Sequence, residues 1–328
     1  MSLRFALLLL IFSLTGMFAE SIETVVPATT SRVLGDSDSS ALAYRGYRAL
    51  ANKDNGFLAV GTEGRIDWIS AEGSVTRSQR IPNVSLTDLL VGEGFTVASG
   101  EKGFLFFSTN NGAFVQVESG TKSDLHALAF FSGKVLVGSD DGVLLVGDKT
   151  GTFQKQQLPL LGKIVSLSAN DKVCYGVTDK GEIAHTKDGI NWSVLDFNEF
   201  YAGYYKPCRF TQVLVTDTRI AVIGVHQDDT PALIFSTEGS VWTERGLNYA
   251  DENNLSGVLD VAPNNLIYNA SIDEFVLCCN KGKLLVVPAC SHCNKLYKFG
   301  TEDLYGMATT ENNLLVAGGN YFVKSILY

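Results

Sequence analysis

The segment VLVGSDDGVLLVG, residues 135–147, has the pattern of a β-hairpin. An alternating apolar run leads into a short polar turn that ends at Gly142, and a second apolar run follows. Alternation with a period of two places every second side chain on one face of a strand, and a turn glycine accepts the positive φ that tight hairpins need. The segment therefore predicts two antiparallel strands joined by a tight turn.

Nearly the same hairpin recurs along the chain. Four copies have turn glycines spaced 39 residues apart, namely Gly64, Gly103, Gly142 and Gly181. Looser copies follow at residues 220–236, 274–288 and 313–328. Such a fixed interval in a sequence without low complexity indicates a repeat architecture with seven units.

Each hairpin is accompanied by two further apolar runs. Residues 125–131 precede the hairpin quoted above, and residues 192–197 follow the hairpin that turns at Gly181. Four short strands in about 40 residues are typical of a propeller blade, because one such sheet buries both faces only when neighbours stack against it. Helical periodicity is absent after the N-terminal apolar run, which disfavours a parallel βαβ fold. The sequence predicts an all-β fold, a seven-bladed β-propeller over residues 22–328.

The two ends of the repeat region predict how the ring closes. The last copy stops at Tyr328 after its third strand, whereas residues 22–34 precede the first blade and have no repeat of their own. A propeller leaves no long sheet edge bare when its termini pair with each other. We expect residues 22–34 to supply the outer strand of blade seven, so that the N-terminal strand pairs with the last blade.

Residues 1–21 have the pattern of a secretory signal peptide. Arg4 precedes an apolar run from Phe5 to Phe18, and the small residues Ala19 and Ser21 follow. The run of about 14 residues is shorter than the roughly 20 that a membrane-spanning helix needs. We expect cleavage near Ser21 and a secreted or periplasmic protein without stable membrane insertion. A retained membrane anchor is the alternative.

The composition limits the classes of partner. Lys and Arg number 26 against 35 Asp and Glu, which gives a net charge of -9. Such a surface repels phosphate backbones, so we expect no nucleic-acid partner. The 45% apolar content is that of a soluble globular protein, and 32 glycines against 7 prolines suit many tight turns. We expect a monomer.

A second short motif follows the third strand of several repeats: Ser or Thr, any residue, an acid, glycine and then an aromatic. The clearest copies are Thr186, Asp188, Gly189 and Trp192, and Ser236, Glu238, Gly239 and Trp242. The acid can accept hydrogen bonds from the backbone of the turn, and the aromatic can pack between blades.

On this motif the sequence resembles the Asp-box propellers, the superfamily that includes BNR-repeat sialidases and the photosystem II assembly-factor family. The resemblance covers roughly residues 43–328 at the level of architecture. It implies that the box residues stabilise turns remote from any active site. It does not imply a particular activity, because fold and function are separable.

Signatures of an enzyme are weak. A sialidase-like site needs clustered arginines and a tyrosine with an acidic partner, and beyond Arg80 only Arg209, Arg219 and Arg245 are present. The four histidines lie in different repeats, and the GxSxG and HExxH motifs are absent from the sequence. We expect no catalytic residue, no cofactor and no metal site.

The chain has six cysteines. In the segment CSHC, Cys290 and Cys293 can form a local disulfide or remain free thiols, and a metal site with His292 or a redox pair are the alternatives. The redox alternative lacks the helical context of thioredoxin-like motifs. Cys278 and Cys279 are adjacent on an expected strand, so their side chains should point to opposite faces of the sheet.

The 39-residue rhythm breaks in three places: the link at 196–210, an enlarged turn at 225–231 and the link at 248–257. Links between blades and turns between second and third strands emerge on the same face of a propeller. We expect these insertions to meet above blades four and five. The candidate binding residues there are Phe200, Tyr201, Tyr204, Tyr205, Lys206, Arg209, His226, Asp228 and Asp229.

Exposed aromatics beside charges are typical of partner recognition, and stacked tyrosines also suit sugar rings. The alternative is that the tyrosines only cap the core of their own blade. We therefore interpret the chain as a non-enzymatic binding scaffold whose partner is a protein or a glycan. The competing interpretation is a glycan-active hydrolase in which Asp228, Asp229 or Glu199 act as acid and base.

Overall fold

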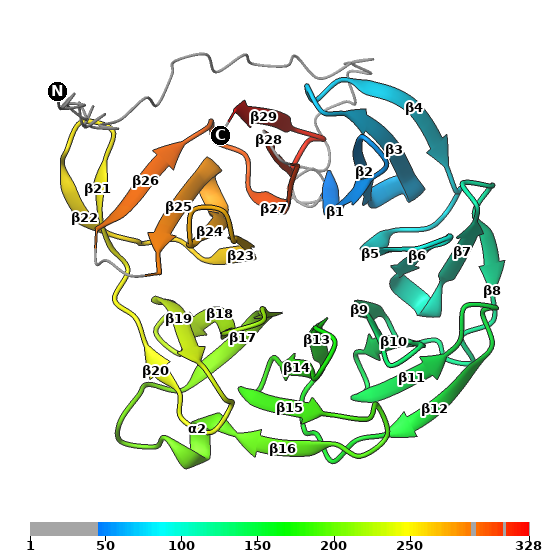
Figure 1. Cartoon of the computed structure of the whole chain (residues 1–328), viewed down its shortest axis with the longest axis horizontal. Coiled ribbons are helices and arrows are strands. Elements are labelled where there is room, and N and C mark those ends of the chain that lie inside the picture. Colours follow the sequence, from blue (N-terminus) through cyan, green and yellow to red (C-terminus); the bar gives the residue numbers. More distant parts are fainter. Residues whose placement is uncertain (1–44, 290–292, 311–312, 328) are drawn as a thin grey trace, which may run out of the picture.

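A computed structural model of the chain describes residues 45–289, 293–310 and 313–327. Seven antiparallel sheets stand in a ring around a central axis, each with its first strand innermost (Figure 1). The prediction of an all-β, seven-bladed propeller is confirmed. The described residues contain one four-residue α-helix, α2 (Phe197–Phe200), and three one-turn 3-10 segments.

The first four blades follow one another without extra elements. Blade one contains β1 (Tyr47–Lys53), β2 (Gly56–Gly61), β3 (Arg65–Ser70) and β4 (Val75–Arg80). Blade two contains β5 (Leu86–Gly92), β6 (Phe95–Gly100), β7 (Leu105–Thr109) and β8 (Val115–Val117). Blade three contains β9 (Leu125–Phe131), β10 (Lys134–Ser139), β11 (Val143–Gly147) and β12 (Phe153–Gln157). Blade four contains β13 (Ile164–Ala169), β14 (Cys174–Thr178), β15 (Glu182–Thr186) and β16 (Ser193–Asp196).

The last three blades carry the irregularities. Blade five contains β17 (Cys208–Val215), β18 (Ile220–His226), β19 (Pro231–Ser236) and β20 (Thr243–Glu244). Blade six contains β23 (Pro263–Asn269), β24 (Glu274–Cys279), β25 (Lys283–Pro288) and β26 (Asn294–Lys298), with an added hairpin of β21 (Asn248–Asp251) and β22 (Ser256–Val258). Blade seven contains β27 (Leu304–Thr309), β28 (Asn313–Gly318) and β29 (Val323–Leu327).

The cores lie between neighbouring blades, and strand alternation explains them. In β10, Val135 and Val137 pack against blade two, whereas Leu136 between them packs against blade four. Cys278 and Cys279 likewise join different cores, on the blade-seven side and the blade-five side of blade six. Each second strand is thus buried on both faces, so a blade is stable only between two others.

Glycine is required where blades and turns approach closely. Gly64 has a φ of +62°, and a Cβ there would lie 1.8 Å from the carbonyl oxygen of Ile81. Gly138 faces the next blade, where a Cβ would lie 2.4 Å from Cγ2 of Ile164. Gly103, Gly142 and Gly181 also have positive φ. Side chains at these positions would strain the turn or push neighbouring blades apart.

Blades one and seven meet through contacts on both backbone and side chains. The amide of Asn320 donates to the carbonyl of Arg45 at 2.7 Å, and Gly46 forms a bridge with Gly319. Blade seven has three described strands, and the expected fourth, residues 22–34, lies outside the described residues. The prediction that the N-terminal strand closes the ring therefore stays a prediction.

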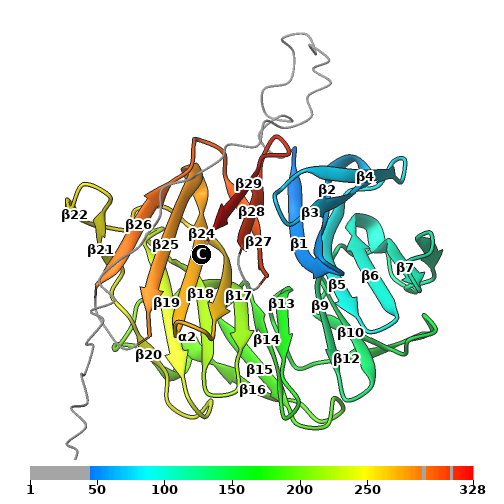
Figure 2. The ribbon, with the colours of Figure 1, turned by 45° about the horizontal axis from the view of Figure 1, so that its top comes forward.

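The third insertion differs from expectation. We expected residues 248–257 on the face above blades four and five, but they form the β21–β22 hairpin at the outer edge of blade six (Figures 1 and 2). There β21 pairs in parallel with β26, and Asn294 Nδ2 donates to the carbonyl of Asn248 at 2.7 Å. The hairpin satisfies backbone groups of the edge strand β26, which explains its position.

The expected signal peptide, residues 1–21, lies outside the described residues, as does Cys290 of the expected disulfide with Cys293. Within the part of the chain that the structure describes, no helix has the length and apolar character needed to cross a bilayer.

Candidate functional site

The link between blades four and five is folded around one buried ring. Asp196 caps α2 because its Oδ1 accepts a hydrogen bond from the amide of Glu199 at 3.0 Å. Phe197 is fully buried, with the rings of Tyr201 and Tyr205 at 4.8 and 5.8 Å between centroids. Phe210 of β17 lies 5.5 Å away on the blade. The link is thus anchored to blade five by packing.

The predicted tyrosines divide into two groups. The hydroxyl of Tyr201 accepts a hydrogen bond from the amide of Trp242 at 3.0 Å, and the hydroxyl of Tyr205 donates to the Trp242 carbonyl at 3.4 Å. These two rings cap the core of blade five, as the alternative interpretation proposed. Phe200 and Tyr204 point outward instead and are 66% and 85% exposed.

Two ion pairs connect the link and the start of β17 to the enlarged turn of blade five. Lys206 Nζ lies 2.5 Å from Asp228 Oδ2, and Arg209 Nη2 lies 2.9 Å from Asp229 Oδ1. The hydrogen bond from Lys206 lowers the pKa of Asp228. Two of the three insertions therefore meet on one face, as expected. We call Phe200, Tyr204 and these ion pairs the blade-five surface.

His226 is placed differently from the expectation of a surface residue. It is 4% exposed and lies beneath the link, with Nδ1 at 3.1 Å from Cys208 Sγ and 3.2 Å from the Lys206 carbonyl. Its Nε2 lies 2.7 Å from Oε1 of Glu244. Sequence reasoning missed Cys208 and Glu244, because their proximity to His226 depends on how the four strands of blade five pair.

This order of thiol, imidazole and carboxylate resembles the relay of a cysteine nucleophile. However, burial and the charge of Glu244 raise the pKa of Cys208 to about 12. Reactive cysteines have lowered pKa values and solvent access, and Cys208 is buried. The arrangement therefore acts as an internal clamp that holds the carbonyl of Lys206 and, with it, the end of the link.

Local hydrogen bonds close the two box turns, and the acid accepts them in the first turn. Asp188 Oδ1 accepts from the amides of Ile190 and Asn191, both at 2.8 Å, and these bonds lower its pKa. In the second turn the amide of Gly239 donates to Ser236 Oγ at 2.8 Å. Trp242 is buried between blades four and five, and Trp192 is half-buried against blade three. These contacts stabilise the two turns.

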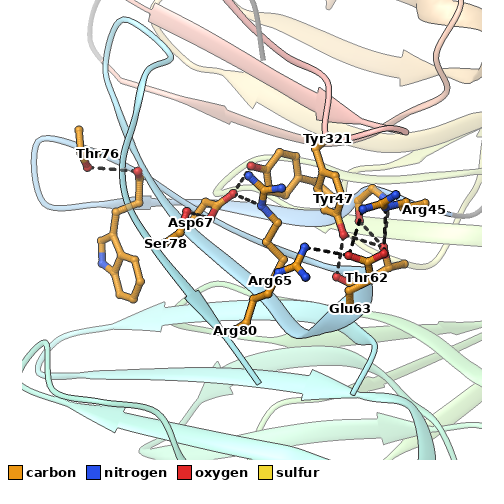
Figure 3. Close-up of polar contacts among 12 residues, drawn as sticks. Arg45, Tyr47, Thr62, Glu63, Arg65, Asp67, Thr76, Ser78, Arg80 and Tyr321 are labelled. Carbon is orange, nitrogen blue, oxygen red and sulfur yellow. Dashed lines mark hydrogen bonds and ion pairs between the residues drawn. The ribbon is translucent and has the colours of Figure 1, made fainter. Parts of the chain in front are cut away.

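A second polar cluster lies where blades one and seven meet (Figure 3). Asp67 is fully buried and accepts hydrogen bonds from Tyr47 Oη, Arg65 Nε and Ser78 Oγ, the last two at 2.5 Å. The Arg65 guanidinium lies 4.3 Å from the ring centre of Tyr321. Burial, together with the charge of Asp67, raises the pKa of Tyr47.

Comparison with protein-family models and with curated proteins finds no match. The fold is similar to the computationally designed Ika8 protein, with a TM-score of 0.61 at 14% identity over 87% of this chain and 97% of the designed one. It is also similar to the WD40 domain of Pan2 from Neurospora crassa, with a TM-score of 0.66 at 11% identity over 86% and 88% of the chains. At these identities the likeness shows the propeller fold alone.

Proposed function

We propose that the chain is a non-enzymatic binding scaffold that recognises a protein partner through the blade-five surface. The observation that carries the proposal is the outward position of Phe200 and Tyr204, at 66% and 85% exposure, on a link whose other aromatic rings are buried or half-buried. Large apolar side chains that stay exposed on the surface are typical of interaction sites. The propeller supplies a rigid support for them.

The layout favours a protein over a glycan. Phe200 and Tyr204 give the link an exposed apolar area. The ion pairs of Lys206 with Asp228 and Arg209 with Asp229 lie beside this area. An apolar centre with a charged rim is the usual anatomy of a protein interface.

The hydrolase alternative has less support. A general acid needs a raised pKa, whereas the ion pair with Lys206 lowers that of Asp228. A cavity of about 630 Å³ opens at the channel end opposite the links, and among its lining residues Asp217 is the single carboxylate. Paired carboxylates, which glycoside hydrolysis normally requires, do not line this cavity.

We also propose that the scaffold acts after export to a secreted or periplasmic location. The support for this is the sequence of residues 1–21, in which Arg4 precedes an apolar run and small residues. Mass spectrometry of the mature N-terminus tests it. A chain that begins near Ser21 is expected, and a retained residue 1 in the cell membrane would contradict it.

The binding proposal is tested by photo-crosslinking in the source cells, with a photoreactive residue at position 202, which is exposed on the link between Phe200 and Tyr204. We expect a discrete protein adduct that disappears in the double variant Phe200→Ala, Tyr204→Ala. Leu161→Ala is the matched control, because Leu161 is 84% exposed on another link. An adduct that survives in the double variant would contradict the proposal.

A glycan panel with the same variants separates the two partner classes. Glycan binding that the double variant loses, without any protein adduct, would replace the protein proposal with the glycan alternative. A protein adduct without glycan binding supports the proposal as stated.

A further inference from the structure

Three potential metal ligands converge on the inner rim of blade three. Asp124 ends the link from blade two, His126 lies in β9, and Asp140 lies in the turn after β10. One ligand atom from each residue lies within 4.8 Å of the other two. The amide of Asp140 donates to the carbonyl of Asp124 at 2.9 Å, so the backbone fixes their separation.

The contact between His126 and Asp140 is not a normal hydrogen bond. Nε2 of His126 lies 2.7 Å from Oδ1 of Asp140, yet this oxygen is buried and has no hydrogen-bond partner. An imidazole that donates to a carboxylate does so with a nearly linear N–H···O angle. A metal ion bound by both side chains would satisfy this oxygen in place of that hydrogen bond.

Another blade provides an internal comparison. Asp303 precedes blade seven as Asp124 precedes blade three, and each accepts a hydrogen bond from the amide of a turn lysine, at 2.8 and 2.7 Å. Blade seven has Tyr305 and Gly319 where blade three has His126 and Asp140. Holding the turn therefore requires the first aspartate alone, and this role does not account for the imidazole and the second carboxylate.

One positively charged side chain, that of Lys163, already pairs with the cluster. Lys163 Nζ lies 2.8 Å from Oδ2 of Asp140, which leaves Oδ1 facing His126. Asp124 is held through one oxygen by the Lys102 amide, an arrangement that orients a carboxylate ligand. All three side chains are half-buried, so an ion can reach them from solvent.

We propose that Asp124, His126 and Asp140 form a binding site for a divalent transition-metal ion. One imidazole and two carboxylates are a ligand set typical of zinc, manganese or cobalt, and the imidazole disfavours calcium and magnesium. The ion would tie together the link, the inner strand and the turn of blade three. The sequence did not indicate it, because the third ligand comes from a different strand connection.

Cobalt(II) is the probe, added to the full-length mature protein without an affinity tag. We expect one saturable site with weak visible absorption bands and without the intense sulfur-to-metal band that a cysteine site would show. Calcium at the same concentration should not displace cobalt. A spectrum dominated by the sulfur-to-metal band would assign the binding to cysteines and overturn the proposal, as would an absence of saturable binding.

Four variants locate the site. His126→Gln and Asp140→Asn should each weaken cobalt binding by about tenfold or more. Lys163→Met, which removes a competing positive charge, should strengthen it by about tenfold. Asp171→Asn, the charge-matched control in an exposed turn of blade four, should change it by less than about twofold.

Lys163→Met is expected to bind cobalt more tightly than the wild type. Unfolding of a variant would not produce this result, so it tests the site even if another variant unfolds. Circular dichroism without metal should be the same for all four variants. Equal cobalt affinity in the wild type, His126→Gln and Asp140→Asn would overturn the proposal.

Discussion

The junction of blades one and seven and the link of blades four and five are built from similar residues and differ in one respect. At the junction, Asp67 is buried with donors on both of its oxygens. On the link, Phe197 and its neighbouring rings are packed, but Phe200 and Tyr204 remain in solvent. Aromatic and charged composition alone therefore does not identify a binding site. The groups that packing leaves exposed are the ones that we propose for binding.

The difference between the junction and the link also predicts which variants affect the stability of the fold and which affect binding. Loss of a buried acceptor leaves its donors unpaired, which costs more than loss of an exposed contact. Exposed ion pairs such as Lys206 with Asp228 contribute little to folding. We expect variants at the junction to change the free energy of unfolding and variants on the blade-five surface to change binding.

The largest expected effect concerns the junction. If residues 22–34 pair with β29, a mature chain that begins after residue 34 should lose roughly 5 kcal/mol of unfolding free energy, since about five ladder hydrogen bonds contribute about 1 kcal/mol each. Urea unfolding of the two chain lengths measures this. Equal stability, with unchanged hydrogen exchange in β29, would show that the ring closes without this segment.

Asp67→Ala should destabilise the protein by about 3 kcal/mol or more, because it leaves Tyr47, Arg65 and Ser78 without their common acceptor. Glu63→Gln at the same junction is the control, since Glu63 forms exposed ion pairs with Arg45 and Arg80. Thermal unfolding compares the two variants. Similar stability for both would contradict the buried role of Asp67.

Phe197→Leu should cost about 1 to 2 kcal/mol, because the smaller side chain loses ring contacts with Tyr201 and Tyr205. We also expect faster proteolysis within residues 197–207, measured by mass spectrometry of the fragments. An unchanged cleavage rate would show that the link is held by the His226 clamp rather than by packing.

The smallest expected effect is that of Asp228. Its pKa is lowered in the folded protein, so its ion pair with Lys206 stabilises the fold at neutral pH, and that contribution is lost as the pH falls through the folded pKa. Because the carboxylate is exposed, Asp228→Asn should shift the unfolding temperature only slightly at pH 7 and less at strongly acidic pH. A larger drop in unfolding temperature at acidic pH than at pH 7 would contradict a lowered pKa of Asp228.

Much of the fold could be predicted from the sequence, because the period-two alternation and the turn glycines are local signals. The interval between Gly103 and Gly142 places a blade before any contact is known. The same rhythm showed where the link at 196–210 interrupts it. Side-chain roles on that link could not be predicted, since the position of Tyr201 depends on a hydrogen bond from Trp242 in another strand connection.

Contacts between residues that are far apart in the sequence could not be predicted from local patterns either. Tyr47 and Tyr321 lie at opposite ends of the chain, and their rings meet at 5.2 Å because blades one and seven are neighbours. The position of β21 beside β26 depends on which sheet edge is open, and the sequence does not encode that locally. Alternation predicts which face a residue occupies, but it does not predict its partner in another blade.

The most direct test of the contrast measures unfolding and crosslinking together in the double variant Phe200→Ala, Tyr204→Ala. We predict that the adduct at position 202 disappears while the free energy of unfolding changes by less than about 0.5 kcal/mol. A loss of more than about 2 kcal/mol with the adduct retained would contradict the account, because it would show that these two rings serve the fold.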